Sequence, residues 1–447
     1  HPAARPRPHH LTAPPPAGER RMKVLFTSLA HSTHYYPLVP IAWALRTAGH
    51  EVRIASQPEL TETITRTGLT AVPIRWTGDD DPLDAALAEG LHEEATRHVQ
   101  DFDFARRDPR QWTWERLLAL ETVMVPGLYG ILNTDAMVDE LLDVARAWRP
   151  DLVIWETYTM AGAAVARTVG AAHARVVSSV DVALRARQEF LRQARAQPPE
   201  HREDPTAEWL TWTLDRLGCP RGFDEELLTG QWTIDCTAPG SRLPLGLHTV
   251  SVRCVPYNGP SVLPAWLREP PRRPRVCLTF GVSESLEPDT AASILAAVAD
   301  LDAEVVATLD AAARARLTDV PDNVRVVDFV PMNDLLPTCA AVVHHGGFGT
   351  RTTAELHGVP QVIIPFGWDT AVMAEQLERS GAGLGLPVTE LTPAALRDRV
   401  HRVITEPRFT EGARRLRDQA RAAPSPNDIV PLLEELTERH RAPSAAG

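Results

Sequence analysis

Cysteine is scarce in this sequence of 447 residues. Secreted disulfide scaffolds and zinc sites built on cysteine pairs both need cysteines at regular, paired spacings. The five cysteines here are scattered and never form a Cys-x-x-Cys pair; they are Cys219, Cys236, Cys254, Cys277 and Cys339. This distribution argues against a disulfide framework and against a structural zinc ion, and it suits a reducing cytoplasm.

Long apolar runs are absent as well. No segment approaches the roughly 20 apolar residues that a helix needs to span a bilayer. Residues 1–21 are rich in Pro, Arg and His and lack the apolar core of a secretory signal, so we expect a disordered extension there rather than a metal-binding tract. The sequence therefore predicts a soluble, cytoplasmic protein with no membrane partner.

Positive charge is outnumbered in the chain. The 46 lysines and arginines face 58 aspartates and glutamates, which gives a net charge of -12 at pH 7. Proteins that bind a phosphate backbone or an anionic membrane surface rely on an excess of basic residues. We therefore expect neither nucleic acid nor a membrane surface as a partner.

What the sequence does contain is a regular alternation of strand and helix patterns. Residues 23–30 form a short apolar run typical of a buried parallel strand, residues 37–48 have helical apolar spacing, and residues 51–55 predict a second strand. The same pattern returns at residues 151–178. Strand, helix and strand in succession indicate right-handed crossover units, so the first half is predicted to be α/β.

A Pro-rich stretch at residues 255–275 predicts a linker, because proline is excluded from helix interiors and central strands. A chain of this length also exceeds the size of a single core. After the linker, strands are predicted at residues 275–280, 303–309, 324–329, 340–345 and 361–365. We expect two Rossmann-like, doubly wound domains that face each other across a cleft, at residues 22–254 and 276–426. Residues 427–447 are expected to form a C-terminal helix that crosses back to the first domain.

Two stretches of the first half, residues 76–115 and 196–230, look less regular and are rich in tryptophan. Insertions of this kind often shape an acceptor pocket. The alternative is that the tryptophans fill a helical core. The four tryptophans concerned are Trp112, Trp114, Trp209 and Trp212.

Open α/β sheets bind ligands beyond the carboxyl ends of their strands, so the strand-to-helix loops are the candidate sites. The clearest is the loop at residues 344–350. Its glycines, Gly347 and Gly349, allow close backbone approach, and the following helix N-terminus suits a diphosphate. His345 and Thr350 can add side-chain donors. The alternatives are a glycine turn needed only for packing and a degenerate dinucleotide fingerprint.

A second loop, at residues 30–37, follows the first strand and contains two histidines. A neutral imidazole can take a proton from a hydroxyl group near neutral pH, so a histidine here is a candidate general base. Glu156, at the end of a strand that reaches the same sheet edge, could orient it. The alternative is that the histidines are surface or capping residues.

Two further loops carry polar groups at strand ends. Asp369 and Thr370 could hold sugar hydroxyls while Trp368 supplies an apolar face, although Asp369 could equally cap a helix. Gly281 and Ser283 could contact a phosphate, although turn chemistry alone explains them almost as well.

These four loops, and longer segments at residues 199–213, 230–235 and 255–260, resemble the family-1 glycosyltransferases of antibiotic biosynthesis. The resemblance is closest to macrolide deoxyaminosugar transferases of the desosaminyl and mycaminosyl type. It runs from about Met22 to the final helix, and it implies the two-domain GT-B fold. It also implies an inverting transfer that needs no metal ion or other cofactor.

The resemblance further assigns roles. It implies that His34 is the catalytic base, and Glu156 stands where many relatives carry an aspartate. It implies that Asp369 faces the donor sugar; Asp369-Thr370 replaces the Asp-Gln pair frequent in the wider family. The diphosphate would contact His345, Gly347, Gly349 and Thr350, and the nucleobase would lie between Val330 and Met332.

The activity implied is transfer of a deoxyaminosugar from a dTDP-deoxysugar to a hydroxyl group of a hydrophobic polyketide acceptor of the macrolide type. Some relatives also need a P450-like activator protein, which the insertions of the first domain could bind. Three alternatives remain at this point: the same reaction on an aromatic polyketide, a nucleotide-sugar epimerase, and a non-catalytic nucleotide-sugar sensor.

Overall fold

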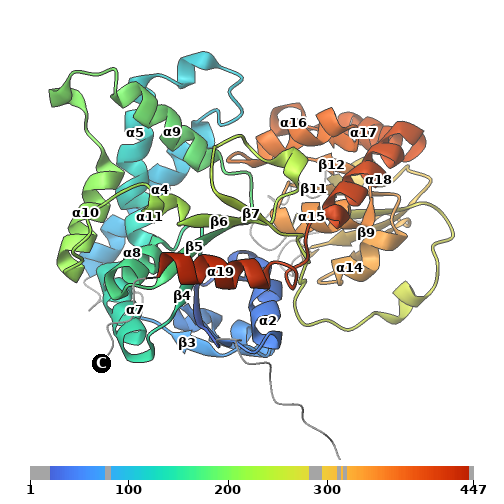
Figure 1. The fold of residues 1–447 in the computed structure, drawn as a ribbon. Coiled ribbons are helices and arrows are strands. Elements are labelled where there is room, and N and C mark those ends of the chain that lie inside the picture. The colour runs from blue at the N-terminus through green and yellow to red at the C-terminus, as the bar shows by residue number, and fades with distance from the viewer. Residues whose placement is uncertain (1–20, 76–81, 281–293, 310–313, 316–319, 442–447) are drawn as a thin grey trace, which may run out of the picture.

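The computed structural model describes residues 21–75, 82–280, 294–309, 314–315 and 320–441. Within these residues the chain forms two α/β units side by side, each built around a parallel sheet (Figure 1). The predicted fold class, two doubly wound domains, is therefore confirmed.

The first sheet has seven strands, all paired in parallel, in the order β3-β2-β1-β4-β5-β6-β7. The strands are β1 (Lys23–Thr27), β2 (Glu51–Ser56), β3 (Ala71–Pro73), β4 (Leu152–Glu156), β5 (Ala172–Val177), β6 (Trp232–Asp235) and β7 (Thr249–Ser251). The helices of this half are α1 (Ser32–Tyr35), α2 (Val39–Thr47), α3 (Thr61–Arg66), α4 (Pro82–Asp101), α5 (Trp114–Met124), α6 (Gly130–Leu132), α7 (Asp135–Trp148), α8 (Met160–Val169), α9 (Val182–Ala194), α10 (Pro205–Leu217) and α11 (Glu226–Thr229).

The second sheet has six parallel strands in the order β10-β9-β8-β11-β12-β13. The strands are β8 (Arg275–Thr279), β9 (Glu304–Thr308), β10 (Val324–Val327), β11 (Ala341–His344), β12 (Gln361–Ile363) and β13 (Gly383–Gly385). The helices that follow are α14 (Met332–Leu335), α15 (Phe348–His357), α16 (Thr370–Ser380), α17 (Pro393–Thr405), α18 (Pro407–Ala422) and α19 (Val430–His440).

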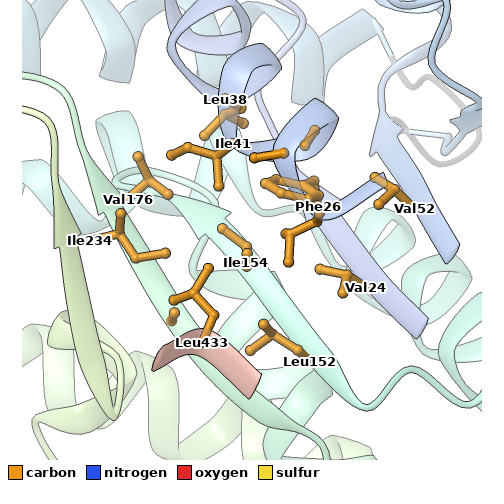
Figure 2. Packing of buried hydrophobic residues seen from close by; sticks show 14 of the residues in the cluster. Val24, Phe26, Leu38, Ile41, Val52, Leu152, Ile154, Val176, Ile234 and Leu433 are labelled. Carbon is orange, nitrogen blue, oxygen red and sulfur yellow. The ribbon is translucent and has the colours of Figure 1, made fainter. Parts of the chain in front are cut away.

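Strand β1 shows why these strands read as continuous apolar runs. Val24 and Phe26 pack into one hydrophobic cluster, together with Ile41 of α2, whereas Leu25 packs into a second cluster on the opposite face of the sheet. Figure 2 shows the first of these clusters. Helices cover both faces of the sheet, so the side chains that point to either face are buried. Consecutive residues of such a strand are therefore apolar.

The last helix, α19, packs against the first sheet although it follows the second sheet in the chain (Figure 1). Leu433 lies in the same cluster as Val24 and Phe26 and is fully buried (Figure 2). Two polar contacts support this packing: near the middle of the helix, Glu434 lies 3.0 Å from Nε2 of His50, and just after its C-terminal end Arg441 forms an ion pair with Asp151 at 2.9 Å.

The prediction of less regular structure at residues 76–115 and 196–230 was wrong for much of both stretches, which contain α4 and α10. Helix α10 has ordinary end signals: the Asp204 side chain accepts a hydrogen bond from the third residue of the helix, and Gly218 ends the helix with a left-handed conformation. Trp112 is buried in a hydrophobic cluster, as the core interpretation predicted, whereas the side chain of Trp212 is 63% exposed.

Residues 252–274, all of them described, contain no strand and only one short 3-10 helix, Ala265–Arg268. They connect β7 of the first sheet to β8 of the second. No single helix in the described part of the chain is long and apolar enough to cross a membrane; one bent pair, Trp114–Leu132 with Asp135–Trp148, passes that test by length and composition only.

Candidate active site

His34 and Glu156 meet at the carboxyl edge of the first sheet. Strands β1 and β4 are neighbours and pair in parallel with Thr27 opposite Trp155, so the segments that follow them leave the sheet at the same edge. Nδ1 of His34 lies 3.1 Å from Oε2 of Glu156. The Glu156 side chain is only 4% exposed, whereas that of His34 is 32% exposed. One ring edge of His34 is therefore held by a buried carboxylate while the side chain stays accessible.

This arrangement also fixes the chemistry available to the imidazole. When Nδ1 carries the proton and donates it in the bond to Glu156, Nε2 is left as a proton acceptor. A negative carboxylate next to the ring also stabilises the imidazolium that forms when Nε2 takes a proton. His31, in the same loop, has a structural role instead. Its ring accepts a hydrogen bond from the backbone N–H of Thr33 and thereby caps α1.

Tyr158 was not among the predicted site residues, although it follows β4 by two positions. Its ring packs edge-on against His34, with centroids 5.7 Å apart, and lies 6.1 Å from the ring of Trp368 in the second domain. The strand-end rule that selected Glu156 could have found it. Tyr158 therefore connects the histidine to the facing loop of the other domain.

The loop that follows β11 brings four predicted residues together. Gly346 has a positive φ of 103°, and Gly347 precedes α15 without any side-chain cap, so the backbone N–H groups of the first helical turn have no side-chain partner there. An added Cβ on Gly347 would meet Nε2 of His345 at 2.6 Å, but one on Gly349 would meet nothing within 4 Å. Thr350 lies in the same turn. The helix end is thus tightly packed behind Gly347 and open beside Gly349.

The two histidines of this loop are both expected to be neutral. Burial lowers the pKa of His344 to about 3 and that of His345 to about 4. His344 is structural: Nε2 pairs with Gln361 at 2.9 Å and Nδ1 accepts a hydrogen bond from Gly346. The Nδ1 atom of His345 is buried without a hydrogen-bond partner. An anion at this helix end would therefore meet the helix dipole and a neutral imidazole rather than an imidazolium.

Asp369 contacts the first domain. One of its oxygens, Oδ2, accepts a hydrogen bond from the backbone N–H of Val180 at 3.1 Å. Burial raises its pKa to about 7, and the Val180 bond and the charge of Arg351 oppose that rise. The side chain makes no capping hydrogen bond to α16, so the capping alternative was wrong.

The neighbours of Asp369 differ in what they can offer a ligand. Trp368 is half-buried and has a φ of +50°, a left-handed conformation that is uncommon for a non-glycine residue. The hydroxyl of Thr370 is engaged within its own turn, donating to the carbonyl of Gly367 and accepting from the backbone N–H of Phe366. Thr370 thus stabilises the loop through its hydroxyl, and its contact with a sugar stays a prediction.

The two residues expected to flank a nucleobase, Val330 and Met332, lie just after β10, and that role stays a prediction. The side chain of Val330 is buried in a cluster with Leu335. Met332 is half-buried, with its sulfur 4.0 Å from that of Cys277. Phe329, which the sequence analysis did not select, is 52% exposed in this loop. The signal that could have found Phe329 is an apolar residue shortly after a strand end.

The remaining candidates lie elsewhere or cannot be placed. Gly281 and Ser283 are outside the described residues. Within the residues that are described, no group of three or more His, Cys, Asp or Glu side chains is arranged to hold a metal ion. The described site thus offers an accessible imidazole backed by a buried carboxylate, and an uncapped helix end in the opposite domain.

Comparison with known proteins identifies the family of the chain. Residues 43–281 match the N-terminal domain, and residues 292–436 the C-terminal domain, of the family described as erythromycin biosynthesis protein CIII-like. The chain is 53% identical over 429 residues to 10-deoxymethynolide desosaminyltransferase of Streptomyces venezuelae, covering 95% of this chain and 99% of the relative. It is 50% identical to 3-alpha-mycarosylerythronolide B desosaminyl transferase of Saccharopolyspora erythraea, covering 94% of this chain and 100% of the relative.

A solved structure is similar along almost the whole chain. The crystal structure of the glycosyltransferase VinC in complex with dTDP has a TM-score of 0.82 and 41% identity, covering 94% of this chain and 100% of that one. The GT-B fold expected from the sequence is thereby supported at high similarity. The chain belongs to the erythromycin biosynthesis protein CIII-like family of glycosyltransferases.

Proposed function

We propose that this glycosyltransferase moves a deoxyaminosugar from dTDP to a hydroxyl group of a macrolide-type polyketide, with inversion at the anomeric carbon. The observation that carries the proposal is the bond between His34 and Glu156 beneath the facing donor loop. The desosaminyl transferases at 50% identity or more support the class of donor and acceptor, and VinC in complex with dTDP supports the nucleotide.

In the proposed mechanism His34 takes the proton from the acceptor hydroxyl as the new bond forms. The hydroxyl oxygen attacks the anomeric carbon from the face opposite the diphosphate, and the bond from that carbon to the diphosphate oxygen breaks. Glu156 stabilises the imidazolium that results. The direct displacement inverts the configuration of the anomeric carbon.

The departing diphosphate would carry away the electron pair of the broken bond, and its charge must be stabilised. The N-terminus of α15 is the feature suited to this, because its backbone N–H groups and helix dipole favour an anion next to Gly349. The neutral His345 would contribute a hydrogen bond. We propose that this helix end suffices and that no metal ion takes part.

The experiment is mass spectrometry of the products formed from a dTDP-deoxyaminosugar and a panel of macrolactones. The wild type is expected to give a glycosylated product, with or without a chelator, and His34→Ala to lower the rate by about 10²–10⁴. His31→Ala is the matched control, because His31 caps α1 and makes no bond to Glu156. Normal product from His34→Ala would overturn the base assignment, and a changed donor without any acceptor would indicate an epimerase.

Two further parts of the proposal concern the setting of the reaction. The five cysteines are all free, which suits a reducing compartment, and we place the enzyme in the cytoplasm.

We also propose that a P450-like activator binds the first domain near α10, where Trp212 exposes an apolar face. Trp212→Ala is then expected to abolish stimulation by the activator and to leave the unstimulated rate unchanged; a normal response would contradict this site.

A further inference from the structure

Two loops of the first domain contact the second domain at the sheet edge that carries His34. Strands β5 and β6 are parallel neighbours, so the loops that follow them leave the sheet at its carboxyl edge. The loop after β5 provides the backbone N–H of Val180, which bonds to Asp369 at 3.1 Å. The loop after β6 provides Ser241, the last residue of the short 3-10 helix Pro239–Ser241. Ser241 makes the second polar contact between the domains.

Ser241 bonds to the two helices that begin at the proposed donor loops. Its hydroxyl oxygen accepts a hydrogen bond from Nη2 of Arg351 in α15 at 2.8 Å, and its backbone carbonyl accepts one from Nε2 of Gln376 in α16 at 2.9 Å. Helix α15 follows the loop at residues 344–350, and α16 follows Asp369. Ser241 is buried, with 5% of its surface exposed. One serine of the first domain therefore holds both helices.

Arg351 is the partner that depends most on this contact. Its side chain is only 4% exposed and pairs with Glu355 of the same helix at 2.8 Å. Burying a guanidinium group is costly unless its N–H groups find acceptors. A further contact of Nη2, to the amide oxygen of Gln376, is long at 3.5 Å. The pair with Glu355 lies within α15, so the bond to Ser241 is the part that requires the two domains to be docked.

Both sides of this contact are held in the first domain. Arg242, next to Ser241, pairs with Asp235, the last residue of β6, at 3.1 Å. It also donates a hydrogen bond to the hydroxyl of Ser251, the last residue of β7. From the other side, Phe348, the first residue of α15, packs against the hydrophobic cluster of the first domain. The position of Ser241 is therefore set by the ends of two strands, and α15 is packed against the same domain.

We propose that Ser241 is a positioning residue for the sugar transfer: through Arg351 and Gln376 it fixes the N-terminus of α15 relative to His34. The inference rests on the proposed function, in which that helix end binds the diphosphate and His34 activates the acceptor. Displacement requires the anomeric carbon to lie between the attacking oxygen and the departing diphosphate. A misplacement of about 1 Å can lower such a rate about 10²-fold, so Ser241 can act without touching the donor.

The test measures rate and binding separately in Ser241→Ala, which loses the hydroxyl group but keeps the carbonyl that bonds to Gln376. We expect kcat to fall by about tenfold or more, while the dissociation constant for dTDP, from calorimetry, stays within about twofold. Ser380→Ala is the matched control, because the Ser380 hydroxyl donates to Leu377 within α16; both quantities should stay unchanged. The inference is overturned if kcat is unchanged in Ser241→Ala, or if kcat and dTDP affinity fall by the same factor, as a purely structural role predicts.

A second variant shows whether Arg351 acts through Ser241. Arg351→Lys keeps a positive charge beside Glu355 but replaces the branched guanidinium with a single ammonium group. It is expected to lower kcat by a similar factor. The double variant should lower kcat by no more than about twofold beyond Ser241→Ala alone, because both changes remove the same bond. A loss equal to the product of the two single losses would show that the residues act separately and would overturn the inference.

Hydrogen exchange provides a readout that needs neither donor nor acceptor. The backbone N–H of Val180 bonds to Asp369 across the two domains, so its exchange reports how firmly they are docked. Ser241→Ala should accelerate exchange in the peptide that contains Val180, whereas Ser380→Ala should not. Unchanged exchange in Ser241→Ala overturns the inference. If the wild type forms no product, the proposed function fails while this exchange still decides the role of Ser241, so the two failures are distinguishable.

Discussion

At the residue scale, Glu156 is informative because it is buried and touches only one side of the histidine. The other oxygen of its carboxylate, Oε1, is buried without a hydrogen-bond partner. The carboxylate therefore interacts mainly with His34, through Oε2, and is not part of a larger hydrogen-bond network. Glu156→Gln keeps an oxygen that can accept from Nδ1 of His34 but removes the negative charge. We expect kcat to fall by about tenfold or more while the donor KM stays within about twofold.

A second variant at position 156 separates the effect of the negative charge from that of the side-chain shape. Glu156→Asp keeps the charge on a shorter side chain and should retain more activity than Glu156→Gln at equal folded content. Steady-state kinetics with circular dichroism on the same samples provides both quantities. If the amide variant is the more active of the two, the carboxylate does not stabilise the imidazolium.

Asp369 gives a second prediction at this scale, for the stability of the protein without donor. Its pKa is about 7 in the folded state, raised by burial, against 3.8 for an exposed aspartate. Between these pH values the folded state retains a proton that the unfolded state has released, so the free energy of unfolding falls as the pH rises from about 4 to about 7. The cost remains in full above pH 7.

Asp369→Asn removes that cost, since an amide does not ionise and its oxygen can still accept from Val180. The variant is expected to be more stable than the wild type by about 1–4 kcal/mol at pH 8 and nearly equal to it at pH 4. Urea unfolding at both pH values tests this, with Asp322→Asn, at an exposed position, as the control. An equal effect of Asp369→Asn at the two pH values would contradict it.

At the scale of elements, two glycines at the N-terminus of α15 are expected to have different roles, Gly347 in packing and Gly349 in binding. Gly347→Ala would push a Cβ to within 2.6 Å of His345, whereas Gly349→Ala meets no protein atom within 4 Å. Alanine is also favoured over glycine inside a helix by about 0.5–1 kcal/mol. We expect Gly349→Ala to keep or slightly raise the melting temperature and to weaken dTDP binding, because its methyl group enters the space next to the helix end.

The companion variant should behave in the opposite sense. Gly347→Ala is expected to lower the melting temperature, because the neighbouring imidazole must move. Thermal unfolding and calorimetric titration with dTDP distinguish the two. Unchanged dTDP affinity in Gly349→Ala would show that the diphosphate does not approach this face.

The elements also show how far a sequence can be interpreted. The long strands were predictable, because a strand buried on both faces must be apolar throughout, and the meeting of His34 with Glu156 followed from adjacent strands ending at one edge. Of the three-residue strands, β12 was predicted because it lies within a longer apolar run, whereas β3, β7 and β13 were not, because so short a segment alone carries no periodic pattern. The bond from Val180 to Asp369 joins residues 189 positions apart and depends on how the domains dock, for which there is no local signal.

At the scale of the whole molecule, the chain links the two domains twice, once through residues 252–274 and again where it returns to form α19. The return matters energetically, because Leu433 fills the core of the first sheet and is fully buried. Leu433→Ala is expected to lower the free energy of unfolding by about 2–5 kcal/mol, the usual cost of such a cavity. Leu432, its neighbour, is 40% exposed and provides the control.

The region in which hydrogen exchange accelerates shows whether α19 stabilises the first domain. Leu432→Ala should change the stability by no more than about 0.5 kcal/mol. Because α19 lies against the first sheet, hydrogen exchange in Leu433→Ala should accelerate in β1 and β5 of the first domain more than in β11 and β12 of the second. Faster exchange confined to α19 itself would mean that the helix covers the first core without stabilising it, and that the two domains are held together by their mutual contacts alone.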